Sequence, residues 1–176
     1  MQSKSAETYV PAEDTFFLAE HIAKEKGGLA LEIGTGSGYL AGILQQNFDF
    51  VVATDIEFYT LKHQGEQIQN KICCDGANAL GNKFDLIVSN LPYLPSEKII
   101  DKTIDGGPEG LSVPLGIIES ASTCVKPGGK MLLLTSSLAN YQKLLKKAQH
   151  MGFSASIIAK KKLFFEELVI IEAVKS

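Results

Sequence analysis

The chain has 176 residues, a length at which one hydrophobic core can hold a single domain. Hydrophobic residues make up 45% of it and charged residues 21%, a composition that excludes a disordered chain. The 17 Lys and Arg against 20 Asp and Glu give a net charge of −3, which argues against a broad electrostatic surface for nucleic acid. We expect one domain over 1–176, with 1–28 as an N-terminal helical extension.

The cysteines, histidines and apolar runs bear on compartment and metal binding. Cys73, Cys74 and Cys124 form no Cys-x-x-Cys pair, a pattern typical of a reducing compartment. The histidines lie far apart in the sequence, so no metal site is expected. The chain begins with polar residues, and no apolar run approaches the roughly 18 residues that a membrane span needs. The sequence predicts a cytoplasmic protein that contacts no membrane.

Apolar periodicity alternates along the chain between helical and strand spacing. The first helix is expected over 13–26, ended by the glycines at 27–28. The residues that this helix is expected to turn inward are Phe16, Phe17, Ile22 and Ala23. The other expected elements are a strand over 29–33, a glycine turn over 34–38 and a helix after it, a strand over 50–54, a helix over 59–68, strands over 71–74 and 86–89, a loop over 90–112, a helix over 114–125, a strand over 131–135 after a break at 127–129, a helix over 140–151, and strands over 156–159 and 168–174.

This order predicts an α/β fold. Alternating strands and helices favour a mostly parallel sheet with helices on both faces. The link between the last two strands is too short for a helical crossover, so these strands are expected to pair antiparallel.

The glycine turn over 34–38 joins a strand to a helix, which is where a doubly wound sheet binds its ligand. A dinucleotide fingerprint requires its third glycine at position 39, where Tyr39 stands instead. Near the ends of the first three strands stand Glu32, Asp55 and Asp75. Ionised acceptors suit a ligand that carries a cationic centre, ribose hydroxyls and an adenine amino group but no phosphate. The pattern therefore favours S-adenosylmethionine.

Each acidic residue has an expected role in binding this ligand. Asp55 accepts hydrogen bonds from the ribose hydroxyls, Asp75 accepts one from the adenine amino group, and Glu32 offsets the ammonium directly or through water. Asp55 lies about 21 residues after Gly34, the spacing of a ribose-binding acid. The alternative, strongest for Asp75, is a structural role as a helix N-cap or Asx-turn.

The fourth expected strand ends in Asn-Leu-Pro-Tyr at 90–93. This tetrad resembles the Asp/Asn/Ser-Pro-Pro-Tyr/Phe signature of methyltransferases that act on planar amino groups of glutamine, adenine or cytosine, with leucine replacing the first proline. The resemblance implies that the side-chain oxygen of Asn90 and the carbonyl of Leu91 accept N–H bonds from the methyl acceptor, on which Tyr93 stacks. The implied catalytic residues are Asn90, Leu91, Pro92 and Tyr93. Because ribosomal RNA adenine dimethyltransferases carry the same tetrad, nucleic-acid methylation is an alternative.

Two further segments extend the resemblance. Residues 9–16, Tyr-Val-Pro-Ala-Glu-Asp-Thr-Phe, resemble the Tyr-Glu-Pro-Ala-Glu-Asp-Thr-Phe stretch of archaeal and eukaryotic HemK-type release-factor glutamine methyltransferases, with Val10 in place of a glutamate. Residues 106–110, Gly-Gly-Pro-Glu-Gly, match the Gly-Gly-x-x-Gly loop of that family, which is implied to line the substrate entrance. The resemblance implies a Rossmann-like class I methyltransferase fold with seven strands, S-adenosylmethionine as cofactor and no metal. The implied cofactor-binding residues are Thr15, which helps to close the pocket, Glu32, Gly34, Thr35, Gly36, Gly38, Asp55, Ile56, Asp75, Gly76 and Asn90.

The resemblance also implies a substrate and a partner. The substrate is the glutamine amide in the Gly-Gly-Gln tripeptide of a class I translation release factor. Protein lysine and nucleic-acid adenine remain alternative acceptors, and a cofactor-binding scaffold without catalysis is a third reading. The implied partner is a small zinc-binding activator subunit that adds a strand at 71–74, at the sheet edge. Lysines at 143, 146, 147 and 160–162 are interpreted as solvated surface, so nucleic acid is not an expected partner.

Overall fold

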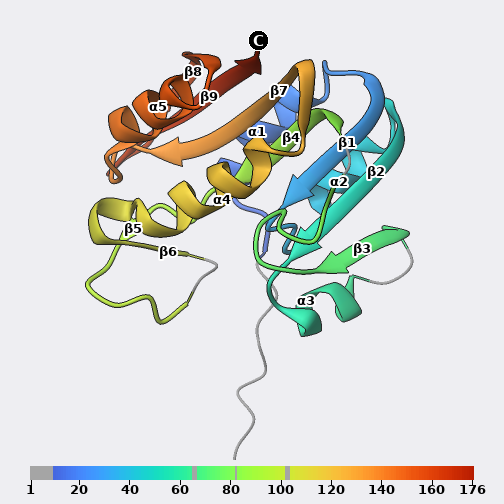
Figure 1. Ribbon diagram of the computed structural model, residues 1–176. Coiled ribbons are helices and arrows are strands. Elements are labelled where there is room, and N and C mark those ends of the chain that lie inside the picture. The colour runs from blue at the N-terminus through green and yellow to red at the C-terminus, as the bar shows by residue number, and fades with distance from the viewer. Residues whose placement is uncertain (1–9, 65–66, 82, 102–103) are drawn as a thin grey trace, which may run out of the picture.

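A seven-stranded sheet forms the centre of the molecule (Figure 1). The computed structural model describes residues 10–64, 67–81, 83–101 and 104–176. In chain order the elements are α1 (Glu13–Ile22), β1 (Gly27–Ile33), α2 (Tyr39–Leu44), β2 (Phe48–Asp55), α3 (Phe58–His63), β3 (Asn70–Cys73), β4 (Phe84–Asn90), β5 (Leu94–Pro95), β6 (Asp105–Gly107), the 3-10 turn η1 (Pro108–Gly110), α4 (Ser112–Ser122), β7 (Val125–Ser136), α5 (Tyr141–His150), β8 (Phe153–Lys162) and β9 (Glu167–Lys175). The strand order is β3-β2-β1-β4-β7-β9-β8.

The expected fold class is confirmed. Strands β1, β2, β3, β4 and β7 pair in parallel, and β9 pairs antiparallel with both β7 and β8. As predicted, the third strand, β3, lies at one edge of the sheet.

Strands β1 and β4 are neighbours at the place where the chain reverses its progress across the sheet. Leu31 and Ile87 pair there in parallel register. The hydroxyl of Ser89 donates to the carbonyl of Ile33 at 2.9 Å and joins the ends of the two strands. The glycine turn after β1 and the tetrad that starts in β4 therefore meet at the carboxyl edge of the sheet.

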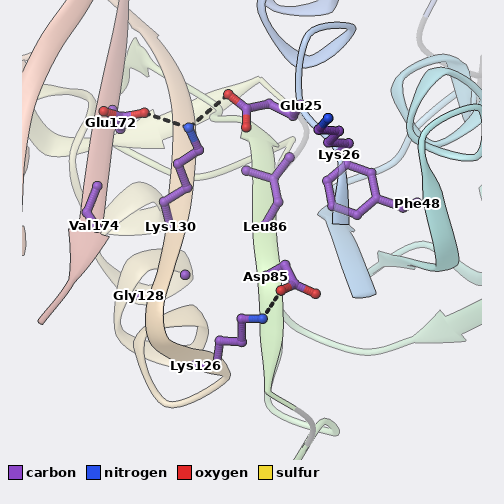
Figure 2. Close-up of a pocket in the computed structure, with 11 residues that line it drawn as sticks. Glu25, Lys26, Phe48, Asp85, Leu86, Lys126, Gly128, Lys130, Glu172 and Val174 are labelled. Carbon is purple, nitrogen blue, oxygen red and sulfur yellow. Dashed lines mark hydrogen bonds and ion pairs between the residues drawn. The ribbon is translucent and has the colours of Figure 1, made fainter. Parts of the chain in front are cut away.

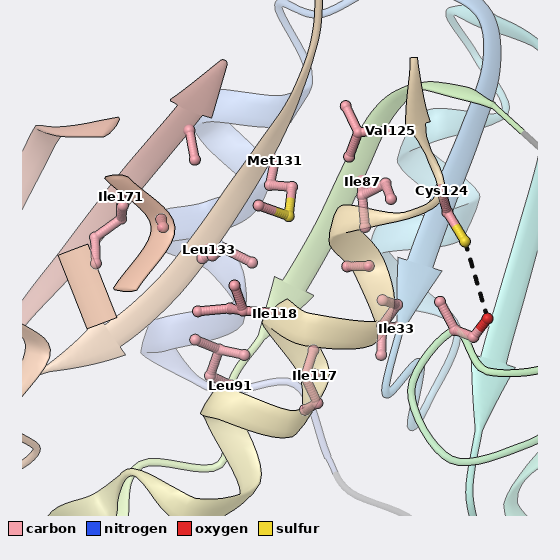
Figure 3. Packing of buried hydrophobic residues seen from close by; sticks show 14 of the residues in the cluster. Ile33, Ile87, Leu91, Ile117, Ile118, Cys124, Val125, Met131, Leu133 and Ile171 are labelled. Atoms are coloured by element: carbon pink, nitrogen blue, oxygen red, sulfur yellow. Dashed lines mark hydrogen bonds between the residues drawn. The ribbon is translucent and has the colours of Figure 1, made fainter. Parts of the chain in front are cut away.

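Apolar side chains cover both faces of the sheet. Helices α4 and α5 pack on one face, and α1 and α2 on the other. Successive residues of β7 alternate between the faces: Met131 and Leu133 belong to the first layer, Leu132 and Leu134 to the second. Figure 3 shows the first layer, with Ile118 of α4 beside Leu133. None of the helices in the described ranges is long and apolar enough to cross a bilayer.

The first helix is shorter than predicted. It ends at Ile22, and the two glycines expected to stop it belong to β1 instead. The carboxylate of Asp85 accepts hydrogen bonds from the backbone N–H groups of Gly28 at 3.1 Å and Leu29 at 2.7 Å, which holds the start of β1 against β4. Because the helix ends early, Ala23 lies outside it and is exposed. Phe16 is also exposed, so these two inward assignments were wrong, whereas Phe17 and Ile22 are buried as expected.

The predicted break before the fifth expected strand, the one over 131–135, is also wrong. Strand β7 runs without interruption through 127–129. Gly128 takes a positive φ of 75°, which glycine adopts readily, and the register against β4 shifts between Phe84 and Leu86. The chain therefore absorbs the Pro-Gly-Gly sequence as an irregularity within one strand.

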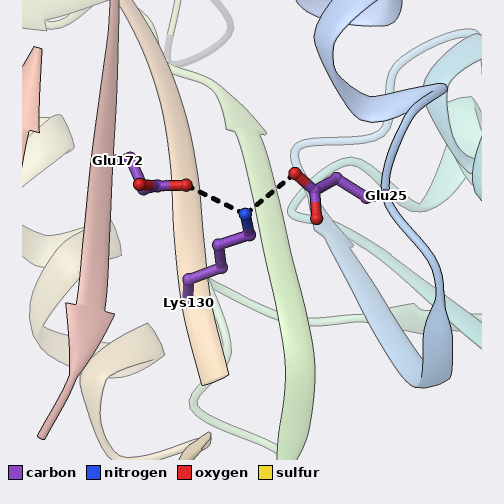
Figure 4. Close-up of polar contacts among 3 residues, drawn as sticks. All are labelled: Glu25, Lys130 and Glu172. Carbon is purple, nitrogen blue, oxygen red and sulfur yellow. Dashed lines mark hydrogen bonds and ion pairs between the residues drawn. The ribbon is translucent and has the colours of Figure 1, made fainter. Parts of the chain in front are cut away.

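Paired charges close the amino edge of the sheet, away from the glycine turn. The ammonium of Lys130 lies 2.8 Å from Glu25 Oε1 and 2.9 Å from Glu172 Oε2 (Figure 4). Burial favours the neutral amine, but the hydrogen bonds to the two glutamates outweigh it and raise the pKa of Lys130. These contacts join β7 to β9 and to the segment that follows α1.

Candidate active site

The glycine turn forms the first wall of the site. Gly34, Gly36 and Gly38 have φ values of 72°, 51° and 80°, a region that other residues adopt at a cost. The N–H groups of Gly34 and Thr35 both donate to the carbonyl of Thr54 at 2.9 Å. The turn is therefore fixed to the end of β2, where Asp55 stands.

Glu32 supports this turn from inside the protein. Its carboxylate oxygen Oε2 accepts hydrogen bonds from the hydroxyl of Thr35 at 2.7 Å and the backbone N–H of Ala41 at 2.8 Å. Burial raises the pKa of Glu32 to about 8, against the two hydrogen bonds, which lower it. At neutral pH the carboxyl is therefore mostly protonated. The expected role of Glu32, to offset the ammonium of the cofactor directly or through water, stays a prediction.

Asp55 is held at the turn by two backbone N–H groups. Its Oδ2 accepts from Gly36 at 2.9 Å and its Oδ1 from Glu57 at 2.9 Å. The hydroxyl of Thr54 donates to the carbonyl of Gly76 at 2.9 Å, which brings the turn after β3 to the same edge. The structure thus gathers the ends of β1, β2 and β3.

The other cofactor candidates surround this point. Ile56 follows Asp55 directly, and Asp75 is exposed in the turn after β3. Thr15 is buried in α1, where its N–H donates to Asp14 Oδ1 at 2.6 Å. The roles assigned to these three side chains stay predictions.

Sequence reasoning missed Gln64, the residue directly after α3. Its Nε2 donates to the carbonyl of Gly36 at 2.5 Å. Its Oε1 is buried and accepts no hydrogen bond from any described residue. A buried acceptor without a donor is destabilising, so this oxygen favours a ligand with an N–H or O–H group. No spacing rule marks a glutamine in a polar helix, so the sequence carried no signal for it.

Asn90 occupies the matching place at the end of β4. Its Nδ2 donates to Asp14 Oδ2 at 3.0 Å. Its Oδ1 is buried, and no described residue donates to it. Because a carboxylate only accepts, the contact with Asp14 requires the Asn90 nitrogen on that side and leaves the oxygen as the free acceptor. In the sequence, Asp14 was marked only by its place in the 9–16 segment. Its contact with Asn90 joins residues 76 positions apart.

The rest of the tetrad is fixed through its backbone. The N–H of Leu91 donates to the carbonyl of Leu134 on β7 at 3.0 Å, and the Leu91 side chain is buried. Pro92 is also buried, whereas Tyr93 is partly buried against the layer formed with α1 and α2.

The 106–110 loop packs directly on this backbone. A Cβ at Gly106 would lie 2.7 Å from the carbonyl oxygen of Pro92. At Gly110, a Cβ would lie 2.8 Å from the Cβ of Ala139 and would collide with the carbonyl oxygen of Tyr93. The loop was expected to line the substrate entrance, a role that stays a prediction. In the structure its glycines allow two backbones to meet and hold the tetrad in place.

A cavity at the opposite edge of the sheet is unrelated to this site (Figure 2). It has a volume of about 440 Å³ and lies between the starts of β2, β4 and β7 and the end of β9. Five of its charged groups are paired: Lys126 with Asp85, and Lys130 with Glu25 and Glu172. Most of the charged groups of the cavity are therefore occupied by protein contacts.

Within the ranges that the structure describes, no three His, Cys, Asp or Glu side chains are grouped as metal ligands would be. His21 and His63 each place Nδ1 against a backbone carbonyl of their own helix, at 2.8 Å and 2.7 Å.

Replacing Gly110 tests the loop contact. Gly110 has a φ of 66°, so Gly110→Ala adds backbone strain as well as the clash with Ala139 and Tyr93. We expect urea denaturation to show a loss of about 1–3 kcal/mol in the free energy of unfolding. Gly116→Ala is the matched control, because a Cβ at that helical position meets nothing within 4 Å. It should be neutral or stabilise by up to ~1 kcal/mol. Equal effects of the two changes would contradict the assignment.

Replacing Glu32 tests its protonation. Between pH 4.5 and about 8 the folded state binds a proton at Glu32 that the unfolded state has released, so this residue makes stability fall as pH rises. The slope approaches about 1.4 kcal/mol per pH unit. Glu32→Gln keeps an acceptor for Thr35 and Ala41 without the titration. We expect thermal unfolding to show the wild type losing stability relative to the variant from pH 5 to pH 8. If stability depends on pH in the same way in both proteins, the raised pKa of Glu32 is refuted.

Comparison with known proteins gives a consistent relationship. The family model described as the methyltransferase small domain matches residues 12–164. A protein of Methanocaldococcus jannaschii named "Putative protein N5-glutamine methyltransferase" is 32% identical over 180 residues, which cover 95% of this chain and 91% of that one. The release factor glutamine methyltransferase of Bradyrhizobium diazoefficiens is 29% identical over 155 residues, and the match spans about half of it, 52%.

A solved structure agrees with these relatives. A chain of the E. cuniculi Mtq2-Trm112 complex, which is responsible for methylation of the translation termination factor eRF1, superimposes with a TM-score of 0.80 at 26% identity. The match covers 96% of this chain and 98% of that one. The resemblance drawn from 9–16, 90–93 and 106–110 and the expected Rossmann-like class I architecture are thereby confirmed. The chain belongs to the methyltransferase small domain family.

Proposed function

We propose that this methyltransferase transfers a methyl group from S-adenosylmethionine to the side-chain amide nitrogen of a glutamine. The observation that carries the proposal is the buried Oδ1 of Asn90, to which no described residue donates. An amide NH₂ group offers two donors, and one of them can complete this acceptor. The backbone carbonyl of Leu91, fixed by the Leu91 bond to Leu134, is assigned the second.

The groups at the ends of β1, β2 and β3 fit the proposed cofactor. Asp55 offers a carboxylate for ribose hydroxyls, Gln64 a buried oxygen for an N–H or O–H group, and Asp75 a carboxylate for the adenine amino group. The glycines of 34–38 let a ligand approach the backbone closely. When bound, S-adenosylmethionine supplies an electrophilic methyl carbon on a sulfonium. Glu32 acts indirectly, by holding the turn through Thr35 and Ala41.

The chemical task of Asn90 is to orient a weak nucleophile. The lone pair of an amide nitrogen is delocalised into its carbonyl, so the nitrogen attacks only when well aligned. Accepting an N–H bond at Asn90 Oδ1 orients the nitrogen and raises its electron density. The Asp14 carboxylate accepts from the Asn90 NH₂ group, which makes the Asn90 oxygen a stronger acceptor and prevents the amide from flipping. Asp14 is therefore a positioning residue. The proposed role of Tyr93 is to stack on the face of the planar acceptor group.

The proposed substrate is the Gly-Gly-Gln tripeptide of a class I translation release factor. Support comes from the names of the relatives, which act on release factors or on protein glutamine. The net charge of −3 favours a protein over a nucleic acid as the acceptor. Such a substrate places the reaction in the cytoplasm.

Methyl transfer and cofactor binding should separate in two variants. Asn90→Ala removes the acceptor and should lower kcat by about 10²–10³-fold while leaving cofactor affinity nearly intact. Asp55→Ala should weaken cofactor binding by roughly 10–100-fold, the value of a charged hydrogen bond. Asp49→Ala, an exposed change on the same strand, is the control. Methyl transfer is measured with labelled cofactor in parallel assays on release factor and on ribosomal RNA. Calorimetry measures cofactor binding.

The outcomes distinguish the candidate functions. Label in RNA alone would establish an adenine methyltransferase, and an Asn90→Ala variant as active as the wild type would refute the catalytic assignment. In the same assays Asp14→Ala should lower kcat, while Glu13→Ala, its exposed neighbour in α1, should not. A mass spectrum of the product locates the methyl group.

We also propose that a small activator subunit pairs with β3, because the structurally similar Mtq2 chain forms a complex with Trm112. Strand β3 pairs only with β2 among the described strands, and its last residue, Cys73, is exposed. The opposite edge is less open, because β8 has a register irregularity between Ile157 and Ala159 and ends in lysines. Strand β3 is thus the edge available for an added strand.

A proline tests this edge. The N–H of Cys74 donates to the backbone carbonyl of Asp55 on β2 at 3.0 Å. Because successive residues of a strand alternate in direction, the N–H of Cys73 points outward. Cys73→Pro removes that outward donor, whereas Cys73→Ala keeps it. Co-purification with a Trm112-type subunit should be lost in the first variant and kept in the second. Retention by both would contradict pairing through β3.

A further inference from the structure

The exposed apolar side chains of this protein are unevenly distributed. Among the described residues, every exposed large hydrophobic side chain except Phe50 and Ile158 lies in a segment at the carboxyl edge of the sheet or beside it. Phe50 and Ile158 lie within strands. Soluble proteins rarely gather exposed apolar groups on one side without a binding partner.

The most exposed aromatic pair stands at the turn between β8 and β9. Phe164 is 91% exposed and Phe165 is 85% exposed. Their rings meet edge to face, with centroids 4.6 Å apart, so they present one apolar unit. The N–H of Leu163 donates to the carbonyl of Glu166 at 2.8 Å and closes the turn beneath them. We call Phe164 and Phe165, together with Lys162, the hairpin tip.

The hairpin tip is firmly connected to the candidate active site. Glu167, at its base, exchanges two hydrogen bonds with Ser137: Ser137 N–H donates to the Glu167 carbonyl at 2.8 Å, and Glu167 N–H to the Ser137 hydroxyl at 2.9 Å. Ala139, two residues further, packs on Gly110, and Gly110 packs on the Tyr93 backbone. The tip and the tetrad are therefore parts of one continuous packed surface.

The sheet register places the hairpin tip relative to Asn90. Asn90 is level with Leu134 on β7, Leu134 with Ile170 on β9, and Ile170 with Ala159 on β8. Strand geometry then puts Phe164 roughly 15 Å beyond the level of Asn90 and about 10–15 Å to its side. This is too far to touch a residue bound at Asn90. A folded domain about 30 Å across can contact both places at once.

The charges around the tip define what it would bind. Lys160 is paired with Glu167 at 2.7 Å, and the ammonium of Lys161 lies 6.0 Å from the centroid of the Phe17 ring. Lys162 is exposed, and the structure records no acidic partner for it among the described residues. The tip therefore suits an apolar patch that carries an acidic side chain. A single exposed lysine is too little for a nucleic-acid backbone.

We propose that the hairpin tip docks the folded body of the protein that carries the methyl-accepting glutamine. This inference rests on the proposed function and adds a second point of contact for the same substrate. Docking at the tip binds the substrate protein, while Asn90 and Leu91 bind only the amide. The affinity for the intact protein thus depends on the tip, and the chemical step does not.

Two substrates separate these contributions. The first is an intact class I release factor, and the second is a short synthetic peptide that carries Gly-Gly-Gln. The variants are Phe164→Ser with Phe165→Ser, and Lys162→Glu; Ile158→Ser, an exposed change within the same strand β8, is the control. All assays use the full chain co-expressed with a Trm112-type subunit. Because Phe164 and Phe165 are almost fully exposed, their loss should leave the melting temperature unchanged.

For the double Phe variant we expect the KM for the intact factor to rise about tenfold or more at unchanged kcat. Lys162→Glu should act in the same direction. Neither change should alter the kinetics with the peptide, and Ile158→Ser should leave the kinetics with both substrates unchanged.

Other results overturn the proposal. An unchanged KM for the factor refutes docking while glutamine methylation stands, and an equal rise with the peptide assigns the tip to the amide site. Loss of retention on phosphatidylserine vesicles at an unchanged KM would indicate lipid instead. If the wild type methylates neither substrate, the proposed function fails and the docking proposal falls with it.

Discussion

The hydrogen bond from Asn90 to Asp14 is the constraint on which the site depends. An isolated asparagine amide can present either its oxygen or its nitrogen to a ligand, because the two ends have nearly the same shape. A carboxylate at 3.0 Å removes this choice, since it can accept but not donate. The oxygen is then committed to a ligand donor. One contact between α1 and β4 thus fixes which end of the Asn90 amide is left without a protein partner among the described residues.

The fold supplies this contact and the glycine turn at one place. Strands β1 and β4 are neighbours, so the turn after Ile33 and the tetrad at Asn90 leave the sheet side by side, joined by the Ser89 hydroxyl. The α1 helix reaches the same point from its own face of the sheet. The loop over 106–110 supports the tetrad from another direction. Ligand groups therefore rest on backbone that is already packed, which favours alignment of a weak nucleophile.

The sequence predicted what depends on local pattern. Periodicity was sufficient for the seven strands of the main sheet and the final hairpin but missed the short pair β5 and β6 within the expected loop, and the motif at 90–93 located the tetrad. Sequence-based prediction failed where contacts between residues distant in the sequence determine the structure. The start of β1, which takes in the two glycines expected to end the first helix, is held by Asp85 through Gly28 and Leu29. The protonation of Glu32 depends on burial beneath the turn, which a strand-end acid does not reveal. For the same reason Gln64, which touches Gly36 across 28 positions, carried no signal.

The two edges of the sheet differ in how their polar groups are satisfied. At the amino edge Lys126 is paired with Asp85, and Lys130 with Glu25 and Glu172. At the carboxyl edge and its loops lie the buried side-chain oxygens for which the described residues provide no partner: Gln64 Oε1, Asn90 Oδ1, Ser96 Oγ, Thr135 Oγ1 and Glu166 Oε2. Such oxygens are destabilising unless a donor reaches them. The carbonyl and carboxylate oxygens among them can only accept, so they favour ligands rich in N–H and O–H groups over phosphates. An edge of this kind fits an adenosyl group and a carboxamide better than a nucleic-acid backbone.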